Sequence, residues 1–155
     1  MCMKLYLVRH GEAVSENVDP RRPLSHDGKK EVEKTAKALR KMGIAVAAII
    51  HSGKKRAQQT ADIIQAAIAP ELKLIQKDSL GPNDSTEQIY KDIMKRSEDF
   101  MIVGHMPFLG KLVSRLVLGD ENRDLVKLTT GSVAALECEA ASWYIIFLIS
   151  PEIFS

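Results

Sequence analysis

The sequence contains little cysteine. Its 155 residues include only two, Cys2 and Cys138, and they are far apart in the chain with no CxxC pairing. Small secreted domains that depend on disulfides carry more cysteines, at close and regular spacings. The composition therefore excludes a disulfide framework, and we expect both cysteines to be free thiols.

The sequence also lacks an excess of charge of either sign. Lys and Arg number 22 and Asp and Glu number 20, which gives a formal net charge of +2. A protein whose main task is to neutralise many nucleic-acid phosphates would be more basic than this. We expect no nucleic-acid partner, and any basic site must be local.

Long apolar runs are absent as well. The longest, Ala45 to Ile50 and Trp143 to Ile149, are far shorter than the ~20 residues that span a bilayer. The first residues, MCMKLYLVRHGEA, lack the long apolar segment and small-residue cleavage site of a secretory signal. These features predict a cytoplasmic protein with no membrane partner.

What the sequence does contain is a regular alternation of short apolar runs and segments of helical period. With 155 residues and 45% apolar composition, it predicts one domain over residues 1–155. Strands are expected at Leu5–Val8, Val46–Ile50, Leu72–Ile75, Phe100–Val103, Ser132–Glu137 and Trp143–Ile149. Between them the pattern predicts helices from an N-cap at Ser25 to Gly43, over Ala57–Ala67 before Pro70, around Ile89–Met94, and over Leu109–Val117 before Gly119.

This βαβα order predicts an α/β fold with a mostly parallel sheet covered by helices. The last two strands are separated only by a short polar turn, so they are expected to form an antiparallel pair at the end of the sheet. Trp143 and the apolar run after it are interpreted as core, and Cys138 as a small buried apolar residue.

Three of the four histidines lie at the ends of predicted strands. His10, His51 and His105 each follow a strand directly or after one residue. In open α/β sheets, ligands bind beyond the carboxyl ends of the strands, where loops and helix N-termini converge. The functional site is therefore expected at this edge of the sheet, although His51 is interpreted as structural and Ser52 only as a possible neighbour of the pocket.

Two arginines accompany these histidines. Arg9 precedes His10, and Arg56 lies in the turn or first helical turn after the second predicted strand. The planar guanidinium group donates paired hydrogen bonds to a tetrahedral oxyanion and stays charged at all relevant pH values. Gly11 is expected to let the backbone approach a bound anion or to adopt a positive φ. The pattern predicts a phosphate-binding site.

A neutral imidazole among fixed cations suits nucleophilic attack on phosphorus. The arginines disfavour protonation of His10, which leaves a ring nitrogen free to react. We expect Arg9, Arg56 and a protonated His105 to hold the phosphoryl oxygens while water cleaves the phosphorylated histidine. Since side chains supply the positive charge, this mechanism needs no metal and no other cofactor.

Three ordered segments resemble the motifs of the histidine phosphatase superfamily. They are LVRHGEA at the first strand end, HSGKKRAQQTA at the second and VGHMP at the fourth. Within the superfamily, RPLSHDG, LGP and LTTGSVAALE resemble the small SixA-type phosphohistidine phosphatases, and the likeness covers nearly the whole chain. The expected fold is then the three-layer α/β/α sandwich of the phosphoglycerate mutase type.

The resemblance implies roles for individual residues. His10 would be the phosphorylated nucleophile, Arg9 and Arg56 would bind the phosphoryl group, and His105 would complete the pocket. Arg22 is either a further substrate contact or solvated surface. The implied substrate is phosphohistidine on a signalling protein, of the histidine phosphotransfer type. A small phosphorylated molecule is the alternative substrate.

The sequence departs from the wider superfamily in one segment. Mutases and many phosphomonoesterases resemble one another in carrying an acidic proton donor where this chain has DSLGPNDSTEQ. Asp84 is only a weak candidate for that role. Cleavage of a phosphoester gains typically 10²–10⁴-fold from a general acid, whereas phosphohistidine loses imidazole more easily. The departure favours cleavage of N–P over O–P bonds.

Two other classes of function fit parts of the pattern. His10, His51 and His105 could ligate zinc in a hydrolase with Glu12 as the base, although Arg9 beside a ligand opposes a dication. Alternatively, the same pocket could recognise phosphohistidine in a phosphoprotein-binding module without turning it over.

Overall fold

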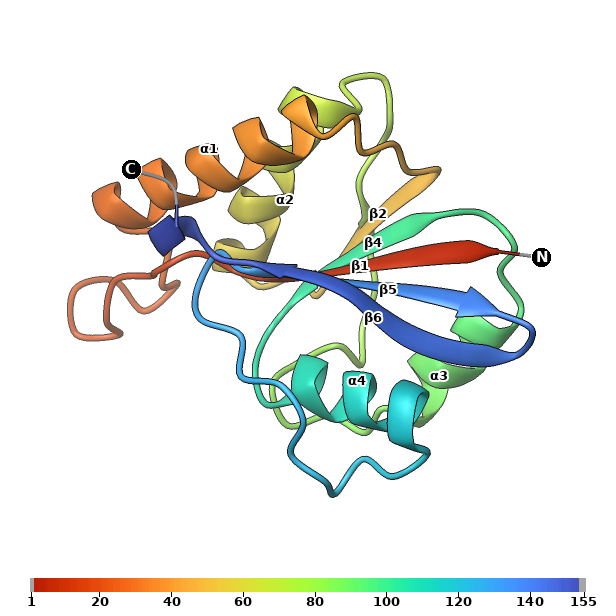
Figure 1. Cartoon of the computed structure of the whole chain (residues 1–155). Helices are drawn as coiled ribbons and strands as arrows, with labels where there is room; N and C mark the ends of the chain where they lie inside the picture. The colour runs from red at the N-terminus through yellow and green to blue at the C-terminus, as the bar shows by residue number, and fades with distance from the viewer. Residues whose placement is uncertain (1, 154–155) are drawn as a thin grey trace.

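The computed structural model describes residues 2–153, which form three layers (Figure 1). A six-stranded sheet with the order β3-β2-β4-β1-β5-β6 lies in the middle. Helices α1 and α2 cover one face, and α3 and α4 cover the other. The predicted α/β/α sandwich is confirmed.

The elements follow the order expected from the sequence. The strands are β1 (Met3–Arg9), β2 (Ala48–His51), β3 (Ile75–Gln76), β4 (Phe100–Gly104), β5 (Val133–Glu139) and β6 (Ser142–Ile149). The helices are α1 (His26–Lys41), α2 (Lys55–Ile68), α3 (Glu87–Met94), α4 (Phe108–Leu118) and the short 3₁₀ helix η1 (Pro151–Ile153).

The sheet is parallel on one side and antiparallel on the other. Strands β1, β4, β2 and β3 pair in parallel, and β5 and β6 continue the sheet beyond β1 in antiparallel pairs. This arrangement confirms the predicted antiparallel edge. It also brings the carboxyl ends of β1, β4 and β2 to the same edge of the sheet.

Central strands bury both faces. On β1, Leu5 and Leu7 pack with α3 and α4, whereas Tyr6 and Val8 pack with α1 and α2. Apolar residues on successive positions satisfy both layers because side chains alternate across a strand.

Helix boundaries follow local signals in the sequence. Ser25 caps α1, as predicted, because its side-chain oxygen accepts the Gly28 N–H at 3.0 Å. Gly119 ends α4 in the left-handed conformation, with φ of 75°, where a residue without Cβ has little strain.

Strand β3 is much shorter than predicted. Only Ile75 and Gln76 pair, with Ile50 and His51, whereas the expected strand was Leu72–Ile75. The amide of Leu72 instead donates to the Ala69 carbonyl in a turn, and the side chains of Leu72 and Leu74 pack toward α1 and α2. Leu72 and Leu74 therefore belong to a turn that packs on the helices, and they are not part of the strand.

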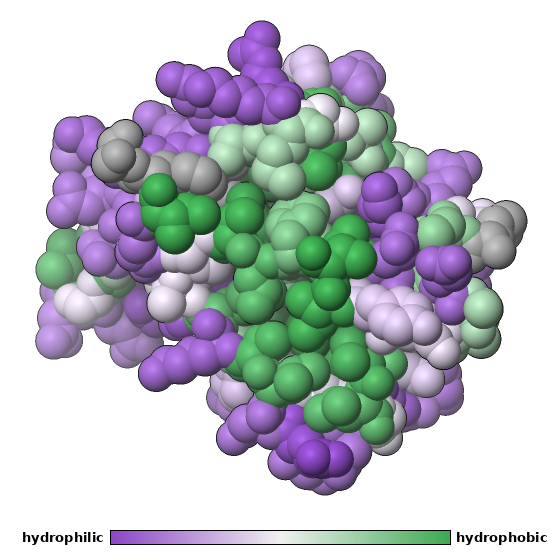
Figure 2. Space-filling model, viewed as in Figure 1, coloured by the Kyte–Doolittle hydropathy of each residue, from purple (hydrophilic) through white to green (hydrophobic). Residues whose placement is uncertain are grey.

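The interpretation of the whole run after Trp143 as core is wrong. Trp143 is buried, but Tyr144, Ile146 and Leu148 are 53%, 40% and 52% exposed. Strand β6 lies at the sheet edge, where one side has no neighbouring strand, and Figure 2 shows apolar side chains gathered on this face. An uninterrupted apolar run does not distinguish a central strand from an edge strand.

No helix within residues 2–153 is long and apolar enough to cross a membrane. Both cysteines are free thiols, as expected, and Cys138 is partly buried against the core.

Candidate active site

The pairing of β1 with β4 places two histidines side by side. Arg9 is in register with Gly104, and the next residue on each strand is a histidine. The His10 amide donates to the Gly104 carbonyl at 2.9 Å, and the centroids of the His10 and His105 rings are 5.0 Å apart. Both side chains are buried, with exposed fractions of 7% and 1%.

The orientation of the His10 ring fixes its tautomer. Its Nδ1 lies 2.7 Å from the carbonyl oxygen of Gly11, which can only accept a hydrogen bond. Nδ1 therefore carries the proton, and Nε2 presents a lone pair. Arg56 donates its Nε–H toward this lone pair at 3.4 Å. Nε2 is the unprotonated ring nitrogen in this arrangement.

Burial keeps His10 neutral. Burial, with smaller contributions from the charges of Arg56, Arg9 and Arg22, lowers the pKa of His10 from 6.5 to about 4, although the hydrogen bond to Gly11 acts in the opposite direction. A buried ring surrounded by cations resists protonation. Nε2 of His10 is thus unprotonated near neutral pH.

The two arginines reach the histidines from different elements. Arg56 lies in the first turn of α2, and burial and the charge of Arg22 lower its pKa while Glu16 raises it. Arg9 ends β1, donates to the Leu128 carbonyl at 2.8 Å, and leaves its buried Nε without a protein partner among the described residues. Both guanidinium groups remain charged.

His105 is held by a serine that follows β2. The Ser52 hydroxyl lies 2.6 Å from His105 Nε2 and also accepts the Lys54 amide at 3.4 Å. The hydroxyl hydrogen takes no part in the contact with Lys54, so Ser52 can donate it to Nε2. We assign the proton of the neutral ring to Nδ1, which is buried and has no partner within residues 2–153.

The surroundings of His105 oppose protonation of its ring, whereas the sequence led us to expect a protonated ring at the phosphoryl oxygens. Burial, followed by the charges of His10, Arg56, Lys54 and Arg9, lowers the pKa of His105 to about 3. The ring is therefore neutral at pH 7 and acts as a hydrogen-bond donor. The VGHMP motif does not reveal how deeply His105 is buried, so the sequence alone did not predict a neutral ring.

Arg22 lies near the site. Its charge lowers the pKa of His10 and of Arg56, and its Nε donates to the Val14 carbonyl at 3.1 Å. Arg22 has a positive φ of 48°, in the long loop between β1 and α1. This placement favours the interpretation of Arg22 as a contributor to the site over solvated surface.

The expected positive φ is absent at Gly11, and close packing of the chain explains the glycine instead. A Cβ at this position would lie 2.5 Å from Cγ2 of Val32 on α1. Its amide donates to the buried Thr60 hydroxyl at 3.0 Å. Gly11 therefore allows close packing of the loop on α1 and, through its carbonyl, orients His10.

Asp84 lies beside the site and contacts neither histidine. Its Oδ2 accepts the Gly81 amide at 2.8 Å, and its side chain lines an open polar pocket that Ser52 also lines. Within residues 2–153, no hydrogen bond of His10, His105 or Arg56 involves a carboxylate.

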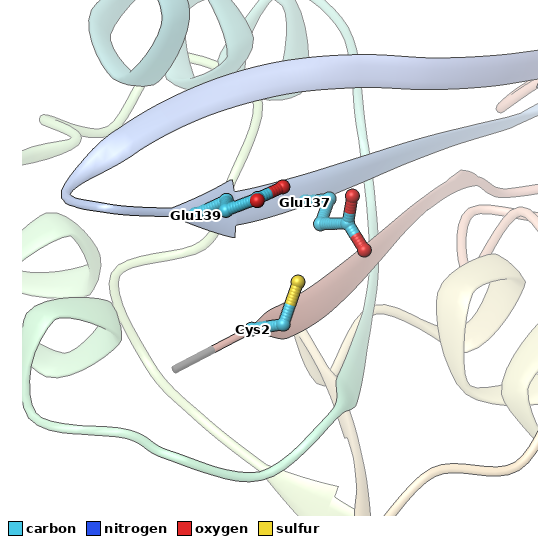
Figure 3. Close-up of side chains that lie close together, drawn as sticks. All are labelled: Cys2, Glu137 and Glu139. Carbon is cyan, nitrogen blue, oxygen red and sulfur yellow. The ribbon is translucent and has the colours of Figure 1, made fainter.

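The geometry does not support zinc binding by the three histidines. In the part of the chain that the structure describes, the one group whose ligand atoms lie within 4.8 Å of one another is Cys2, Glu137 and Glu139 (Figure 3). His51 Nδ1 accepts the Gly53 amide at 3.1 Å, and Glu12 accepts the Ser25 hydroxyl at 2.8 Å. His51 is a structural residue of the turn, as interpreted from the sequence.

Comparison with known proteins identifies the family. The model of the histidine phosphatase superfamily, branch 1, matches residues 5–81, a segment that holds His10, Arg22, Arg56 and the loop before Asp84. The chain belongs to the histidine phosphatase superfamily. An uncharacterized protein of Picosynechococcus sp. is 29% identical over 147 residues, which are 90% of this chain and 87% of that protein.

Solved structures of the superfamily share the fold. The protein histidine phosphatase SixA, complexed with tungstate, has a TM-score of 0.87 at 21% identity and covers 99% of this chain and 100% of its own. The alpha-ribazole phosphatase of Shigella flexneri has a TM-score of 0.76 at 17% identity and covers 96% and 97%. The two have different substrates, so the shared fold leaves the substrate of this superfamily member open.

Three supporting contacts had no clear signal in the sequence. Ser52 orients His105, and Thr60 links the Gly11 amide to the Arg56 carbonyl, to which it donates at 2.8 Å. The Gly131 amide lies within hydrogen-bond distance of the carbonyls of Arg9 and His10. This loop is the LTTG segment, so its resemblance to SixA-type sequences was the one available clue.

Proposed function

We propose that this superfamily phosphatase hydrolyses phosphohistidine on a signalling protein in two steps, without a metal. The observation that carries the proposal is the orientation of His10, with Nδ1–H bound to the Gly11 carbonyl and Nε2 beside Arg56. A neutral Nε2 among cations is a nucleophile aimed at an anionic centre.

In the first step, Nε2 of His10 attacks phosphorus and the N–P bond of the donor breaks. The electron pair of that bond returns to the donor nitrogen, and a donor ring that is protonated at its other nitrogen leaves as neutral imidazole. Arg9, Arg56 and the Nδ1–H of His105 stabilise the charge on the transferred oxygens. No general acid is needed for this leaving group.

In the second step, water attacks the phosphorylated His10. Because Nδ1 keeps its proton throughout, the phosphorylated ring is an imidazolium and departs as a neutral imidazole. The PO₃⁻ unit and water together give H₂PO₄⁻, so protons and charge balance. The intact Nδ1–H bond to Gly11 thus serves both steps.

The position of Asp84 favours one alternative, a small-molecule phosphomonoesterase. An ester releases an alkoxide, which requires a proton, and Asp84 is a candidate donor in the pocket that Ser52 also lines. If esters are the substrates, Asp84→Asn will lower their hydrolysis by about 10²-fold or more. It will lower phosphohistidine hydrolysis by less than tenfold if our proposal is correct.

The decisive experiment compares initial rates on a phosphohistidine-containing phosphotransfer domain and on an aryl phosphate. We expect a higher kcat/KM for the domain, activity that persists in chelator, and a loss of at least about 10⁴-fold in His10→Ala. Acid-quench labelling should place the phosphoryl group on His10. Faster hydrolysis of the ester would contradict the proposed substrate.

The same experiment addresses the remaining alternative, a phosphoprotein-binding module. A module would bind the phosphorylated domain without releasing phosphate in wild type. Tungstate, present in the SixA structure, offers an independent probe, since it should compete with the phosphorylated domain if both occupy the pocket at His10.

A further inference from the structure

A polar pocket of about 390 Å³ opens next to the catalytic histidines. Ser52, Lys54, Gln76, Asp78, Ser79 and Asp84 line this rim pocket. It adjoins the site directly, because Ser52 contacts His105 Nε2 at 2.6 Å. A substrate whose phosphoryl group lies at His10 therefore has the rim pocket beside it.

Two glycines form the walls of the rim pocket. Gly53 has a φ of 89°, and a Cβ there would lie 2.7 Å from Nε2 of Gln76. A Cβ on Gly81 would lie 2.9 Å from Oδ2 of Asp84, which accepts the Gly81 amide. Side chains at these two positions would therefore collide with Gln76 and Asp84, and the Asp84 carboxylate is oriented by the Gly81 amide.

The segment that carries the carboxylates is also fixed to the rest of the fold. The Lys77 amide donates to the His51 carbonyl at 2.9 Å, and the Lys77 ammonium forms an ion pair with Asp92 of α3. Ser79 adopts a positive φ of 73°, an uncommon conformation for a residue with a Cβ. The position of Asp78 and Asp84 relative to β2 is thus set by the fold.

Charge changes sign along the rim pocket. The histidine side is cationic, with Arg9, Arg56 and Lys54, whose charges all act on His105. The segment between β3 and α3 contributes the carboxylates of Asp78 and Asp84, and neither forms an ion pair within residues 2–153. A substrate that matches this pattern has an anionic phosphoryl group followed by a positive charge.

We propose that the rim pocket binds a cationic group on the leaving-group side of the substrate, through Asp78 and Asp84. This inference rests on the proposed function and specifies its substrate class. The cation is either the protonated imidazole ring of the phosphohistidine or a Lys or Arg side chain next to it in the donor protein. Both chemistries place a charged hydrogen-bond donor against two carboxylates.

The test uses the double variant Asp78→Asn/Asp84→Asn, which keeps the shape of both side chains and removes their charge. Asp120→Asn/Asp124→Asn is the matched control, because it removes the same charge and Asp120 also accepts a backbone amide, that of Asn122. Neither control residue lines the rim pocket. Substrates are a phosphohistidine peptide with a neighbouring Arg, the same peptide with Gln at that position, and an aryl phosphate.

We expect kcat/KM of the rim-pocket variant to fall about fivefold on the Arg peptide. It should stay within about twofold on an aryl phosphate of an acidic phenol, whose leaving group carries no cation and needs no proton from Asp84. If the neighbouring Arg is the bound cation, the Gln peptide is unaffected. If the imidazolium is the bound cation, both peptides lose equally. The control variant should match wild type on every substrate.

Equal effects of the rim-pocket variant on peptides and aryl phosphate, or no effect on either peptide, would overturn the inference. The proposed function would survive this result if wild type still hydrolysed phosphohistidine and His10→Ala did not. If wild type hydrolyses only esters, the comparison of an aminoalkyl phosphate with an alkyl phosphate replaces the peptides. In that case, the variant must lose the preference for the amine, or the inference fails.

Discussion

Strand β1 has a group of titratable side chains at each end, and the two groups differ in burial. At the carboxyl end, His10 and His105 are buried with 7% and 1% exposure. At the amino end, the exposed Cys2 lies beside Glu137 and Glu139 of β5 (Figure 3). Proximity of titratable groups is common to both ends, so it cannot by itself mark a catalytic centre.

The chemical states of the two groups also differ. Burial lowers the pKa of His10 to about 4, which exposes a reactive lone pair at neutral pH. A hydrogen bond with Glu137, followed by partial desolvation and the charges of Glu137 and Glu139, raises the pKa of the Cys2 thiol and keeps it protonated. A protonated thiol is a poor nucleophile and a poor metal ligand. The environment activates one end of β1 and makes the other inert.

Among variants that keep His10, the largest effect is expected from removal of a cation at the carboxyl end of β1. Arg56→Gln eliminates the donor to His10 Nε2 and one of the charges that face the phosphoryl group. We expect kcat/KM to fall by about 10²–10³-fold, as for loss of one oxyanion-stabilising donor. Steady-state rates on the phosphohistidine domain measure this effect. A loss below tenfold would mean that Arg56 only fills space near His10.

The titration of His10 gives the second prediction. Because its pKa is about 4 in the folded protein, the nucleophile is neutral above about pH 5, and the neutral fraction falls about tenfold per pH unit below pH 4. In Arg56→Gln, the loss of a neighbouring positive charge should raise the pKa of His10. NMR titration of the His10 ring measures both values. A wild-type midpoint near 6.5 would contradict the buried, cation-flanked geometry.

The sign of the related stability change follows from the same pKa. His10 and His105 bind protons more weakly in the folded than in the unfolded chain, since their pKa values are lowered to about 4 and about 3. The unfolded state therefore takes up protons below pH 6.5, and stability should decrease as the pH falls from 6.5 toward 4. Denaturant unfolding at several pH values tests this expectation, and the His10→Asn variant should show a weaker dependence.

A smaller effect is expected at Ser52. Ser52→Ala removes the hydroxyl that orients His105, so we expect kcat/KM to fall about tenfold, whereas Ser52→Thr keeps the hydroxyl and should retain most activity. ¹⁵N NMR of the His105 ring provides a readout besides activity, because loss of the Ser52 bond should disturb the Nδ1–H tautomer. An unchanged tautomer in Ser52→Ala would exclude the positioning role.

Much of the fold could be predicted from the sequence, because strong local signals mark the elements. Ser25 and Gly119 bounded their helices as expected, and the alternation of apolar runs gave the correct order of strands. No local signal in the sequence indicates which strands pair with one another in the sheet. The short β3 and the exposed face of β6 depend on which strands lie at the edges, and edge position is a property of the assembled sheet.

Some features of the candidate site could likewise be predicted from the sequence, and others could not. The motif residues meet at one edge of the sheet, where the ends of its parallel strands lie together. They are Arg9, His10, Arg56 and His105. Their roles remain predictions until tested. Ser52 was expected only as a possible neighbour of the pocket, because its contact with His105 depends on the β2–β4 register, which has no local signal. The neutral state of His105 depended on burial, which no motif encodes.

The smallest effect is expected at the amino end of β1. The triple variant Cys2→Ser/Glu137→Gln/Glu139→Gln removes the cluster while keeping the size of each side chain. Because these groups lie at the opposite end of β1 from His10, kcat/KM should change by less than about twofold. The unchanged pKa of His10 in the same variant would show that the cations next to the ring, rather than the summed charge of the molecule, set its state. A loss of activity without a loss of stability would instead reveal a connection along β1 that the static contacts do not contain.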